Sequence, residues 1–589
     1  MTEKTAPATK QRETKEFTLM FYFASDNMLA PGIVSQLKAL KQAGYHHNSY
    51  VVAQFDPHTV GTPTHFFDVH HLEKLKHPGT SQVGVLSCEP SALNMFEDKL
   101  WGDEQNLDGV PIREQIAGLL AAENKSIVYD APEPDFGTGG TTGARSGGHE
   151  EPDPRRSLEA FLKFCGEQYP ARHYLLFILG HGLVVGNDVF LYDEHAGRNS
   201  LKLKELGEVL RTFKGSQMPA GSSFDLVSFH SCSVSSLEVA YELQETASYM
   251  LAAQGPTFVG SWPYRQVLTR VFNDLNALER GGKPVNVEAT LSKIFNSIFH
   301  NSTDFLLAGY SFDLCLCDLR KVGALTVPLQ KLSLALSDEM GEPLLRDLVM
   351  LAHLKSQSYW SESYTDLLDF CVCLSRQCDA FKAAGGNAGK ALARVKAACQ
   401  GVVEEWKKGD GLIVRSAFVG PAYQYSHGLS VFFPWTEPSL DNPLWWPQTP
   451  DDPPQGEYAE YEFKQTYWRE FLLNYFEKTM RAPHEGDCEA CPPRQSYEPE
   501  GEKGRLWRRR RSLHEDMASL VYFQEGRAGS DSVLSRKTNA LDPTGDDCSC
   551  PSIKNFPRDT RPRPRRAGKN FKAPCLISHF PAPEPEPDE

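Results

Sequence analysis

Hydrophobic residues in the first half of the chain gather in short runs, separated by segments whose apolar positions recur at helical spacing. The apolar runs predict strands buried on both faces of a sheet, at 17–23, 50–55, 174–179 and 224–229. Shorter strands are predicted at 65–69 and 189–192, and helices at 28–43, 157–168 and 203–213. Strands that alternate with helices in this way predict an α/β fold, with a mostly parallel sheet flanked by helices.

The pattern changes twice in the rest of the chain. Beyond residue 330 it becomes helix-rich, with candidate helices at 342–353 and 386–407 and one strand at 429–433. After residue 480 the chain is charged and rich in Arg and Pro, and it cannot bury enough apolar surface to fold. We predict four regions: a disordered N-terminus at 1–16, an α/β core at 17–330, a C-terminal subdomain at 331–480 and a disordered tail at 481–589.

Composition narrows the class of protein. The 589 residues carry a formal charge of −15, which argues against a nucleic-acid binder. No apolar run approaches the length of a membrane span, and the first residues lack the hydrophobic core of a signal peptide. The 14 cysteines are scattered without a small-domain framework. We therefore expect reduced thiols and a cytoplasmic protein.

The Gly-rich segment and the cysteine pairs of the tail are not interpreted as functional sites. The Gly-rich segment 130–156 does not follow a strand and open a helix at phosphate-loop spacing, so it is interpreted as a surface loop. The cysteine pairs Cys488/Cys491 and Cys548/Cys550 lie in the tail without a zinc-knuckle pattern, and we expect no metal there. The arginine runs of the tail could bind an acidic partner, although solubility alone would explain them.

Cys232 lies where a predicted strand ends and a helix is expected to begin. The residues after it have helical spacing, with Ser233 or Ser235 available as the N-cap. A thiol at this junction would meet unpaired backbone N–H groups and the positive end of the helix dipole, which favour the thiolate. Most intracellular cysteines are small buried hydrophobes, which is the structural alternative. The position is nevertheless where an α/β protein carries a nucleophile.

His181 follows another predicted strand and is flanked by Gly180 and Gly182, which let the backbone turn sharply and leave the imidazole uncrowded. It precedes Cys232 by 51 residues. Caspase-type enzymes have their histidine about 50 residues before the cysteine. Both residues are expected at the carboxyl ends of their strands, where open α/β sheets bind ligands.

Several ordered segments resemble the clostripain-like cysteine peptidases, relatives of caspases, gingipains and legumain. They are LMFYFASDNML (19–29), YPARHYLLFILGHG (169–182), FDLVSFHSCSVSSLEVAYEL (224–243), VGSWPY (259–264) and HGLSVFFP (427–434). Weaker similarities bring the matched region to about 17–480. The resemblance implies a caspase-like catalytic core, a protein or peptide substrate and a cysteine endopeptidase activity.

The resemblance also implies roles for individual residues. Cys232 would attack the scissile carbonyl, and His181 would protonate the leaving amine and later activate water. The backbone N–H groups of Gly182 and Cys232 would stabilise the oxyanion. No third catalytic residue is required in that family, so Asp225 is interpreted as structural. Calcium, on which some relatives depend, is not supported by an oxygen-ligand loop in the sequence, and no cofactor is expected.

The chain departs from the family two residues before the nucleophile. The family typically has an aspartate there, which pairs with an arginine or lysine of the substrate, but this chain has His230. Because an imidazole cannot hold a guanidinium as a carboxylate does, we expect a preference at the cleavage position (P1) other than Arg or Lys. Trp262 resembles a residue that lines the substrate channel, with a core aromatic as the alternative. Self-cleavage of the family kind would fall near Arg198.

Three functions remain open at this point. The first is an active endopeptidase with altered specificity, which we favour. The second is a catalytically idle caspase-like scaffold that binds peptides or partners. The third is another thiol acyl-transfer enzyme, such as an amidase or peptide ligase. A catalytic role for His230 in place of His181 is disfavoured, because side chains two apart on a strand point in parallel and do not converge.

Overall fold

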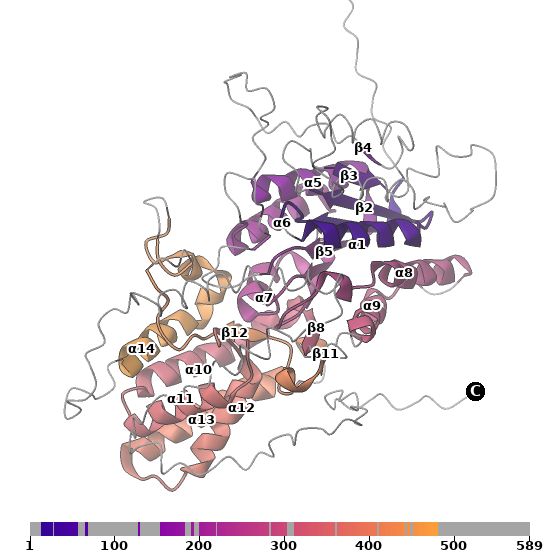
Figure 1. Ribbon diagram of the computed structural model, residues 1–589. Coiled ribbons are helices and arrows are strands. Elements are labelled where there is room, and N and C mark those ends of the chain that lie inside the picture. The colour runs from indigo at the N-terminus through magenta and orange to yellow at the C-terminus, as the bar shows by residue number, and fades with distance from the viewer. Residues whose placement is uncertain are drawn as a thin grey trace, which may run out of the picture. The chain divides into compact units, whose positions relative to one another are not determined.

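Within the part of the chain that the structure describes, the main sheet has nine strands in the order β11-β8-β7-β6-β5-β1-β2-β3-β4. Its five central strands, β7 to β2, are parallel to one another, and antiparallel strands extend the sheet at both edges. A second sheet has three antiparallel strands in the order β12-β10-β9. The predicted α/β fold with a mostly parallel sheet is therefore confirmed at the centre of the main sheet (Figure 1).

The computed structural model describes residues 13–27, 29–56, 65–68, 128–129, 153–182, 190–191, 193, 200–219, 221–281, 284–302, 311–359, 362–408, 411–440, 442, 444–447 and 452–480. Its strands are β1 (Lys15–Phe23), β2 (Ser49–Phe55), β3 (His65–Asp68), β4 (Val128–Tyr129), β5 (Ala171–Leu179), β6 (Phe224–His230), β7 (Ala247–Ala252), β8 (Phe312–Asp318), β9 (Ser358–Tyr359), β10 (Tyr364–Asp366), β11 (Ile413–Val419) and β12 (Ser430–Phe432). Its helices are α1 (Ala30–Ala43), α5 (Pro154–Gln168), α6 (Leu203–Gln217), α7 (Leu237–Leu243), α8 (Tyr264–Glu279), α9 (Val287–Ser302), α10 (Thr326–Glu339), α11 (Pro343–Lys355), α12 (Leu367–Ala380), α13 (Gly386–Trp406) and α14 (Trp468–Met480).

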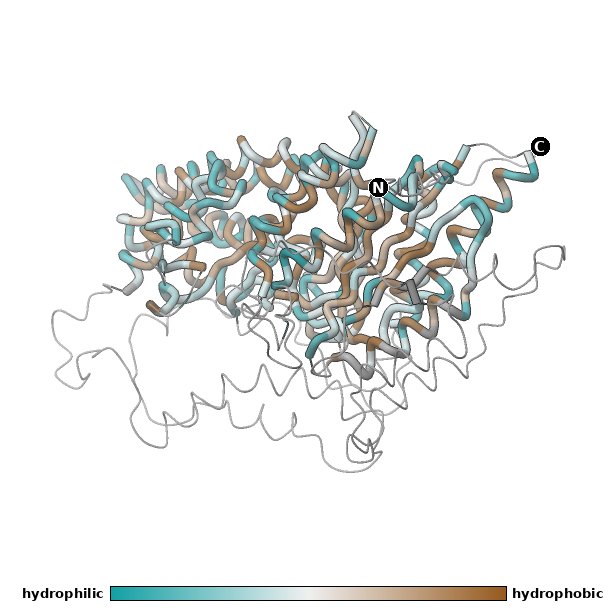
Figure 2. The backbone as a smooth tube through the Cα atoms, turned by 90° about the horizontal axis from the view of Figure 1, so that it is seen from above, coloured by the Kyte–Doolittle hydropathy of each residue, from teal (hydrophilic) through white to brown (hydrophobic). Residues whose placement is uncertain are grey.

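Helices cover both faces of the parallel strands, which explains why those strands are apolar at almost every position. On one face, alternate strand residues such as Phe21 and Phe177 join one buried cluster with side chains of α1, α8 and α9. On the other face, Tyr22 packs against Phe161 of α5 and Tyr174 against Phe213 of α6. Figure 2 shows the central strands mostly in the hydrophobic colour, whereas the helices alternate between the two colours.

The segment after residue 330 forms a set of packed helices and also contributes to the main sheet. Helix α13 packs against α10, α11 and α12, α11 also packs against α12, and α14 packs on α10. Strand β11, however, pairs with β8 at the edge of the main sheet. The predicted core at 17–330 is thus completed by a strand from the predicted subdomain at 331–480, and the boundary between them stays a prediction.

Most predicted elements of the described chain are present, and one is wrong. Phe190 and Leu191, predicted within a strand at 189–192, lie in a turn, and Leu191 has a left-handed backbone with φ 50°. The apolar pair suggested a strand, but the two side chains are buried although their backbone forms a turn.

Two predictions lie outside the described residues. They concern the tail after residue 480, with its cysteine pairs and arginine runs, and the candidate processing site Arg198. No helix in the described ranges combines the length and the apolar character that crossing a membrane requires.

Candidate active site

The pairing of β5 with β6 brings His181 and Cys232 to the same edge of the sheet. Leu179, the last residue of β5, is in register with His230, the last residue of β6. His181 and Cys232 each follow their paired residue by two positions. Because the strands are parallel neighbours about 4.8 Å apart, the two residues leave the sheet side by side. The strand register therefore unites the two residues that the sequence analysis singled out.

Gly182 shows how closely the two loops approach. A Cβ atom at this glycine would lie 2.5 Å from the carbonyl carbon of Cys232 and 2.7 Å from its nitrogen. No side chain tolerates such contacts, so the backbone of the histidine loop rests directly on that of the cysteine loop. The backbone N–H groups of Gly182 and Cys232 donate to no other described residue.

The loop that carries Cys232 differs from the predicted helix N-terminus. The N-cap of α7 is Ser236, whose hydroxyl oxygen accepts the N–H of Val239 at 3.4 Å, rather than Ser233 or Ser235. Ser233 instead has a left-handed backbone with φ 54°. A left-handed residue ends the strand direction abruptly and delays the start of the helix. The N-cap is therefore later in the chain than expected, and Cys232 lies further from the start of α7 than the sequence analysis predicted.

The Cys232 thiol contacts Thr257 in the loop after β7. The N–H of Thr257 donates to Sγ at 3.2 Å, and the thiol faces the Thr257 carbonyl oxygen at 3.5 Å. Burial raises the pKa of the thiol to about 11, although the Thr257 N–H opposes the rise. The expected preference for the thiolate is thus wrong for this arrangement, because the desolvation of a buried charge outweighs one hydrogen bond.

His181 is partly buried and follows β5 at the same edge of the sheet. Its carbonyl oxygen accepts the N–H of Leu191 at 3.2 Å, which fixes the backbone after β5. Burial lowers the pKa of its imidazole to about 4. At neutral pH the candidate pair is therefore a neutral imidazole beside a neutral thiol, and an uncharged imidazole can accept a proton.

His230 points into the interior, stacked on Trp262. Its side chain is 3% exposed, and the two rings are 4.7 Å apart and nearly parallel. Nε2 donates to the Phe258 carbonyl at 2.7 Å because that oxygen can only accept, so Nδ1 accepts the Tyr264 hydroxyl at 3.0 Å. Burial lowers the pKa of His230 to about 3. His230 was predicted to contact a substrate side chain, but in this arrangement its ring is not accessible to a substrate.

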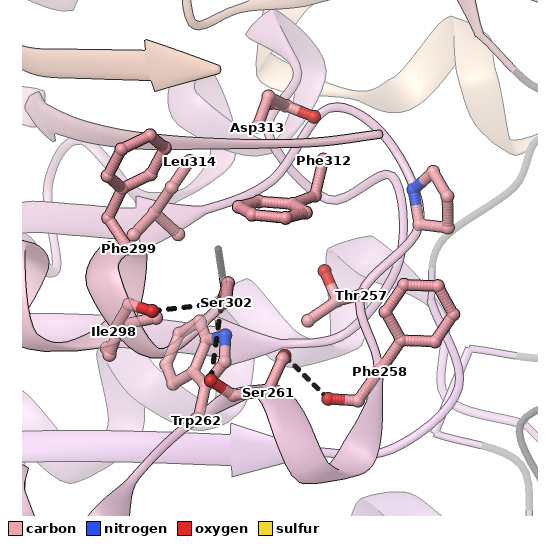
Figure 3. A pocket seen from close by; sticks show the side chains of 11 residues that line it. Thr257, Phe258, Ser261, Trp262, Ile298, Phe299, Ser302, Phe312, Asp313 and Leu314 are labelled. Carbon is pink, nitrogen blue, oxygen red and sulfur yellow. Dashed lines mark hydrogen bonds between the residues drawn. The ribbon is translucent and has the colours of Figure 1, made fainter. Parts of the chain in front are cut away.

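Trp262 lines a small cavity between the loop after β7, α9 and β8. The cavity has about 320 Å³ of empty space, its open mouth included. Figure 3 shows Phe312, Phe299 and Leu314 on one side of it, with Thr257, Ser261 and Trp262 on the other. The Ser261 and Ser302 hydroxyls are already used, since they donate to Phe258 and Ser261 carbonyls at 2.6 and 3.2 Å. Neither His230 nor Cys232 is among the residues that line the cavity.

Sequence reasoning missed the residues that hold the cysteine loop. Gln254, Gly255 and Thr257 hydrogen-bond to the cysteine loop, and Asp313 binds the Gln254 and Gly255 N–H groups. The Tyr423 ring lies against Gly255, so three distant segments of the chain meet here. A weak signal existed, because a Gln-Gly-Pro sequence begins two residues after the end of the buried strand at 247–252 and so lies at the same edge as Cys232. Nothing in the sequence connects Asp313 or Tyr423 with that turn.

Asp225 is structural, as interpreted. Its carboxylate accepts the Tyr174 N–H at 3.0 Å and lies 3.1 Å from His173 Nδ1. Both partners belong to the amino-terminal part of β5, at the far end of the strands from Cys232.

A group of possible metal ligands, His46, His47 and Glu279, lies apart from this edge. His46 Nδ1 accepts the Asn48 N–H at 3.1 Å, so the neutral ring carries its proton on Nε2, the nitrogen that faces Glu279. A metal-bound histidine normally donates through its other nitrogen, which this ring cannot do. Calcium also requires six to eight oxygen ligands. The group therefore suits neither zinc nor calcium.

Comparison with known proteins supports the family. Residues 147–439 match the sequence model of the Clostripain family, peptidase C11. No curated protein matches the chain significantly. An inactive zymogen C11 protease from Parabacteroides distasonis is 14% identical with a TM-score of 0.42, covering 77% of this chain and 99% of its own. A secreted C11 cysteine protease from Bacteroides thetaiotaomicron, solved with an irreversible peptide inhibitor, is 12% identical with a TM-score of 0.41 and the same coverage.

The family match alone carries the assignment, and it includes both His181 and Cys232. Over residues 147–439 the chain therefore belongs to the Clostripain family, and it is a cysteine-type endopeptidase by class.

Proposed function

We propose that the protein hydrolyses peptide bonds with Cys232 as nucleophile and His181 as general acid and base. The observation that carries this proposal is the register of β5 and β6, which makes the two residues leave adjacent strands at the same level. The contact between the Gly182 and Cys232 backbones supports it further.

The pKa directions favour a mechanism that starts from neutral groups. His181 takes the thiol proton as Sγ bonds to the scissile carbonyl carbon, and the carbonyl electron pair moves onto oxygen. The Gly182 and Cys232 N–H groups donate to this oxyanion. Its collapse breaks the C–N bond, and the amine leaves with the proton from His181. His181 then takes a proton from water as the water oxygen bonds to the thioester carbon. The C–S bond breaks, the carboxylic acid product leaves, and His181 returns the proton to the sulfur. These steps need no metal or cofactor.

We further propose that arginine and lysine are poor residues at the cleavage position. His230 is neutral, buried and bound through both ring nitrogens, so it offers no carboxylate to a cationic side chain. A guanidinium that enters a desolvated site without a carboxylate partner is costly. A peptide library that varies the residue at the cleavage position would identify the preferred residue.

A second candidate, an idle scaffold, is favoured by one observation. Burial raises the pKa of the Cys232 thiol to about 11, although the Thr257 N–H opposes the rise. A thiol with so high a pKa is a poor nucleophile until the site rearranges. Acyl transfer to an amine in place of water is the remaining alternative.

The test is a fluorogenic peptide library on the full chain, its Cys232→Ala and His181→Ala variants, and Cys165→Ala as control. Cys165 is buried in α5, away from Cys232, so the control removes a thiol without touching the site. Each site variant is expected to lose at least about a thousandfold in kcat/KM, while the folded control keeps its rate.

Turnover that survives in Cys232→Ala would overturn the mechanism. Strong cleavage after Arg or Lys would overturn the specificity. If wild type neither turns over any peptide nor reacts at Cys232 with a thiol-directed peptidyl probe, the scaffold is correct. Mass analysis of the products separates hydrolysis from transfer to an added amine.

A further inference from the structure

Asp313 fixes the loop that follows β7. Its carboxylate is almost completely buried at the start of β8. Oδ2 accepts the Gln254 N–H and Oδ1 accepts the Gly255 N–H, each at 2.8 Å. A carboxylate that binds two successive N–H groups determines both the position and the direction of that backbone segment. One side chain therefore holds the loop in place.

The other side of the same segment contacts the cysteine loop. The Gly255 carbonyl accepts the Ser233 N–H at 3.1 Å, and the Gln254 carbonyl accepts the Ser233 hydroxyl at 3.1 Å. Two residues further on, the Thr257 N–H donates to Cys232 Sγ at 3.2 Å. Every recorded hydrogen bond of the Cys232 thiol and of the Ser233 side chain thus ends on residues 254–257.

Ser233 needs this support because its backbone is left-handed, with φ 54°. That conformation is unfavourable for residues other than glycine and persists only where the surroundings enforce it. The two hydrogen bonds to the held segment provide the enforcement. Without them the turn after Cys232 would relax and the thiol would change direction.

We propose that Asp313 is a positioning residue for the nucleophile: its carboxylate holds residues 254–257 so that the Thr257 N–H points at Cys232 Sγ and stabilises the thiolate. The proposal rests on the nucleophilic role given to Cys232, but it concerns the state of the sulfur rather than turnover. Figure 3 shows Thr257 and Asp313 beside the same small cavity, on the loop and on β8.

The surroundings of Asp313 bring its pKa into a range where a change of pH alters its charge. Burial raises the pKa of its carboxyl to about 6, although the two N–H groups oppose the rise. The titratable groups that face it from the packed elements are Asp366 with its partner His427, Tyr359, Tyr423 and Cys315. Asp366 also accepts the Gln254 side-chain amide at 3.1 Å. Protonation of Asp313 removes acceptor capacity for the loop, so the hold weakens as the pH falls through about 6.

The experiment measures the alkylation rate of Cys232 by iodoacetamide in the full chain, from pH 5 to 10, by mass spectrometry of the peptide that contains it. The variants are Asp313→Asn, Asp313→Glu and, as control, Asp225→Asn. The control also removes a carboxylate that binds a backbone N–H, but at the far end of the strands. Peptide turnover is recorded in parallel.

The two substitutions of Asp313 differ in how many acceptor oxygens they leave for the N–H groups of residues 254 and 255. Asp313→Asn keeps only one acceptor oxygen, so the pKa of Cys232 should rise by about one unit, the size of one charge-assisted hydrogen bond. Because this pKa lies above the measured range, the shift is read as an alkylation rate about tenfold lower than that of wild type at each pH between 7 and 10. The kcat should fall about tenfold with KM nearly unchanged. Asp313→Glu keeps two acceptors and should recover part of the shift, and Asp225→Asn should show none.

An unchanged alkylation profile in Asp313→Asn, or the same shift in Asp225→Asn, would overturn the proposal. If Asp313→Asn does not fold, wild type decides: the logarithm of the alkylation rate should break from a straight line near pH 6, and a line without a break rejects the role of Asp313. Because alkylation needs no substrate, a protein without turnover but with the predicted shift would contradict only the peptidase function.

Discussion

The two ends of the β5–β6 strand pair hold their polar groups in opposite ways. At the amino end, Asp225 binds the Tyr174 N–H and the His173 ring, and the pKa of His173 is raised. Burial opposes this rise, but the hydrogen bond and the charge of Asp225 outweigh it. At the carboxyl end, burial lowers the pKa values of His181 and His230, and each is most stable without charge.

This difference suggests that the polar groups at the amino end serve stability, whereas those at the carboxyl end serve chemistry. At the amino end, a partly solvent-exposed ion pair stabilises the fold, and no residue there needs an unusual backbone conformation. The carboxyl end carries two histidines whose pKa values burial lowers and a left-handed serine next to Cys232, and the buried Asp313 carboxylate holds the loop that contacts them. Such groups are costly to desolvate or strain, and they persist where surrounding contacts enforce them. This difference between the two ends of the same strands supports the proposal that the carboxyl end carries the function.

The largest expected effect comes from Gly182→Ala at the carboxyl end. The added Cβ would lie 2.5 Å from the Cys232 carbonyl carbon, so the cysteine loop must move. We expect kcat/KM to fall at least about a hundredfold and the free energy of unfolding to drop by about 1–3 kcal/mol. Peptide turnover and urea denaturation measure the two.

The matched control is Gly215→Ala near the end of α6, where an added Cβ meets no atom within 4 Å. It should leave turnover unchanged and stabilise the helix by up to about 1 kcal/mol. Equal losses in both variants would contradict the close approach of the two loops.

The second prediction compares the histidines of the two ends by pH. His230 has a folded pKa of about 3, below its ordinary value of 6.5, so its cost is absent above pH 6.5 and grows as the pH falls. At pH 5 the cost is roughly 2 kcal/mol of unfolding free energy. His230→Gln, which cannot take up a proton, should therefore flatten the loss of stability between pH 7 and 5.

His173 should behave in the opposite sense. Its folded pKa is raised, so its contribution is present below the unfolded pKa and is lost as the pH rises through the folded value. His173→Gln should make the protein lose more stability on acidification than wild type does. Urea denaturation at several pH values follows both variants, and changes of the same sign for the two would refute the comparison.

The smallest effect is expected from Asp225→Asn. The asparagine oxygen can keep the Tyr174 N–H bond, whereas the charged contact with His173 is lost. We expect a loss of about 1 kcal/mol in unfolding free energy, with kcat/KM within about twofold of wild type, since His181 and Cys232 lie beyond the other end of the strands. A large loss of turnover would show that the two ends are coupled.

Prediction from sequence worked best where one local pattern had one structural meaning. The fully apolar runs became the parallel strands β1, β2, β5 and β6, because such runs are stable only between two layers of helices. It failed at residues 189–192, where two buried apolar residues belong to a turn. Burial and strand formation are separate properties, and a short run does not distinguish them.

The candidate site divides in the same way. His181, Cys232 and the position of His230 followed from strand-end motifs and from the family resemblance. The charge of the thiol did not follow, because desolvation depends on neighbours that are remote in sequence. The N-cap of α7 was also misplaced, because the left-handed turn at Ser233 depends on contacts with Gln254 and Gly255.

The sequence by itself determined the alternation of strands and helices and the two strand-end residues, which are local properties of composition and spacing. That His230 replaces an aspartate is what the resemblance to the family implies. Only the tertiary structure decided that His230 is sealed by Trp262, Tyr264 and Phe258, and that Asp313 holds the loop against Cys232. The physical reason is that hydrogen-bond partners and desolvation are set by packing between distant segments, which no local pattern records.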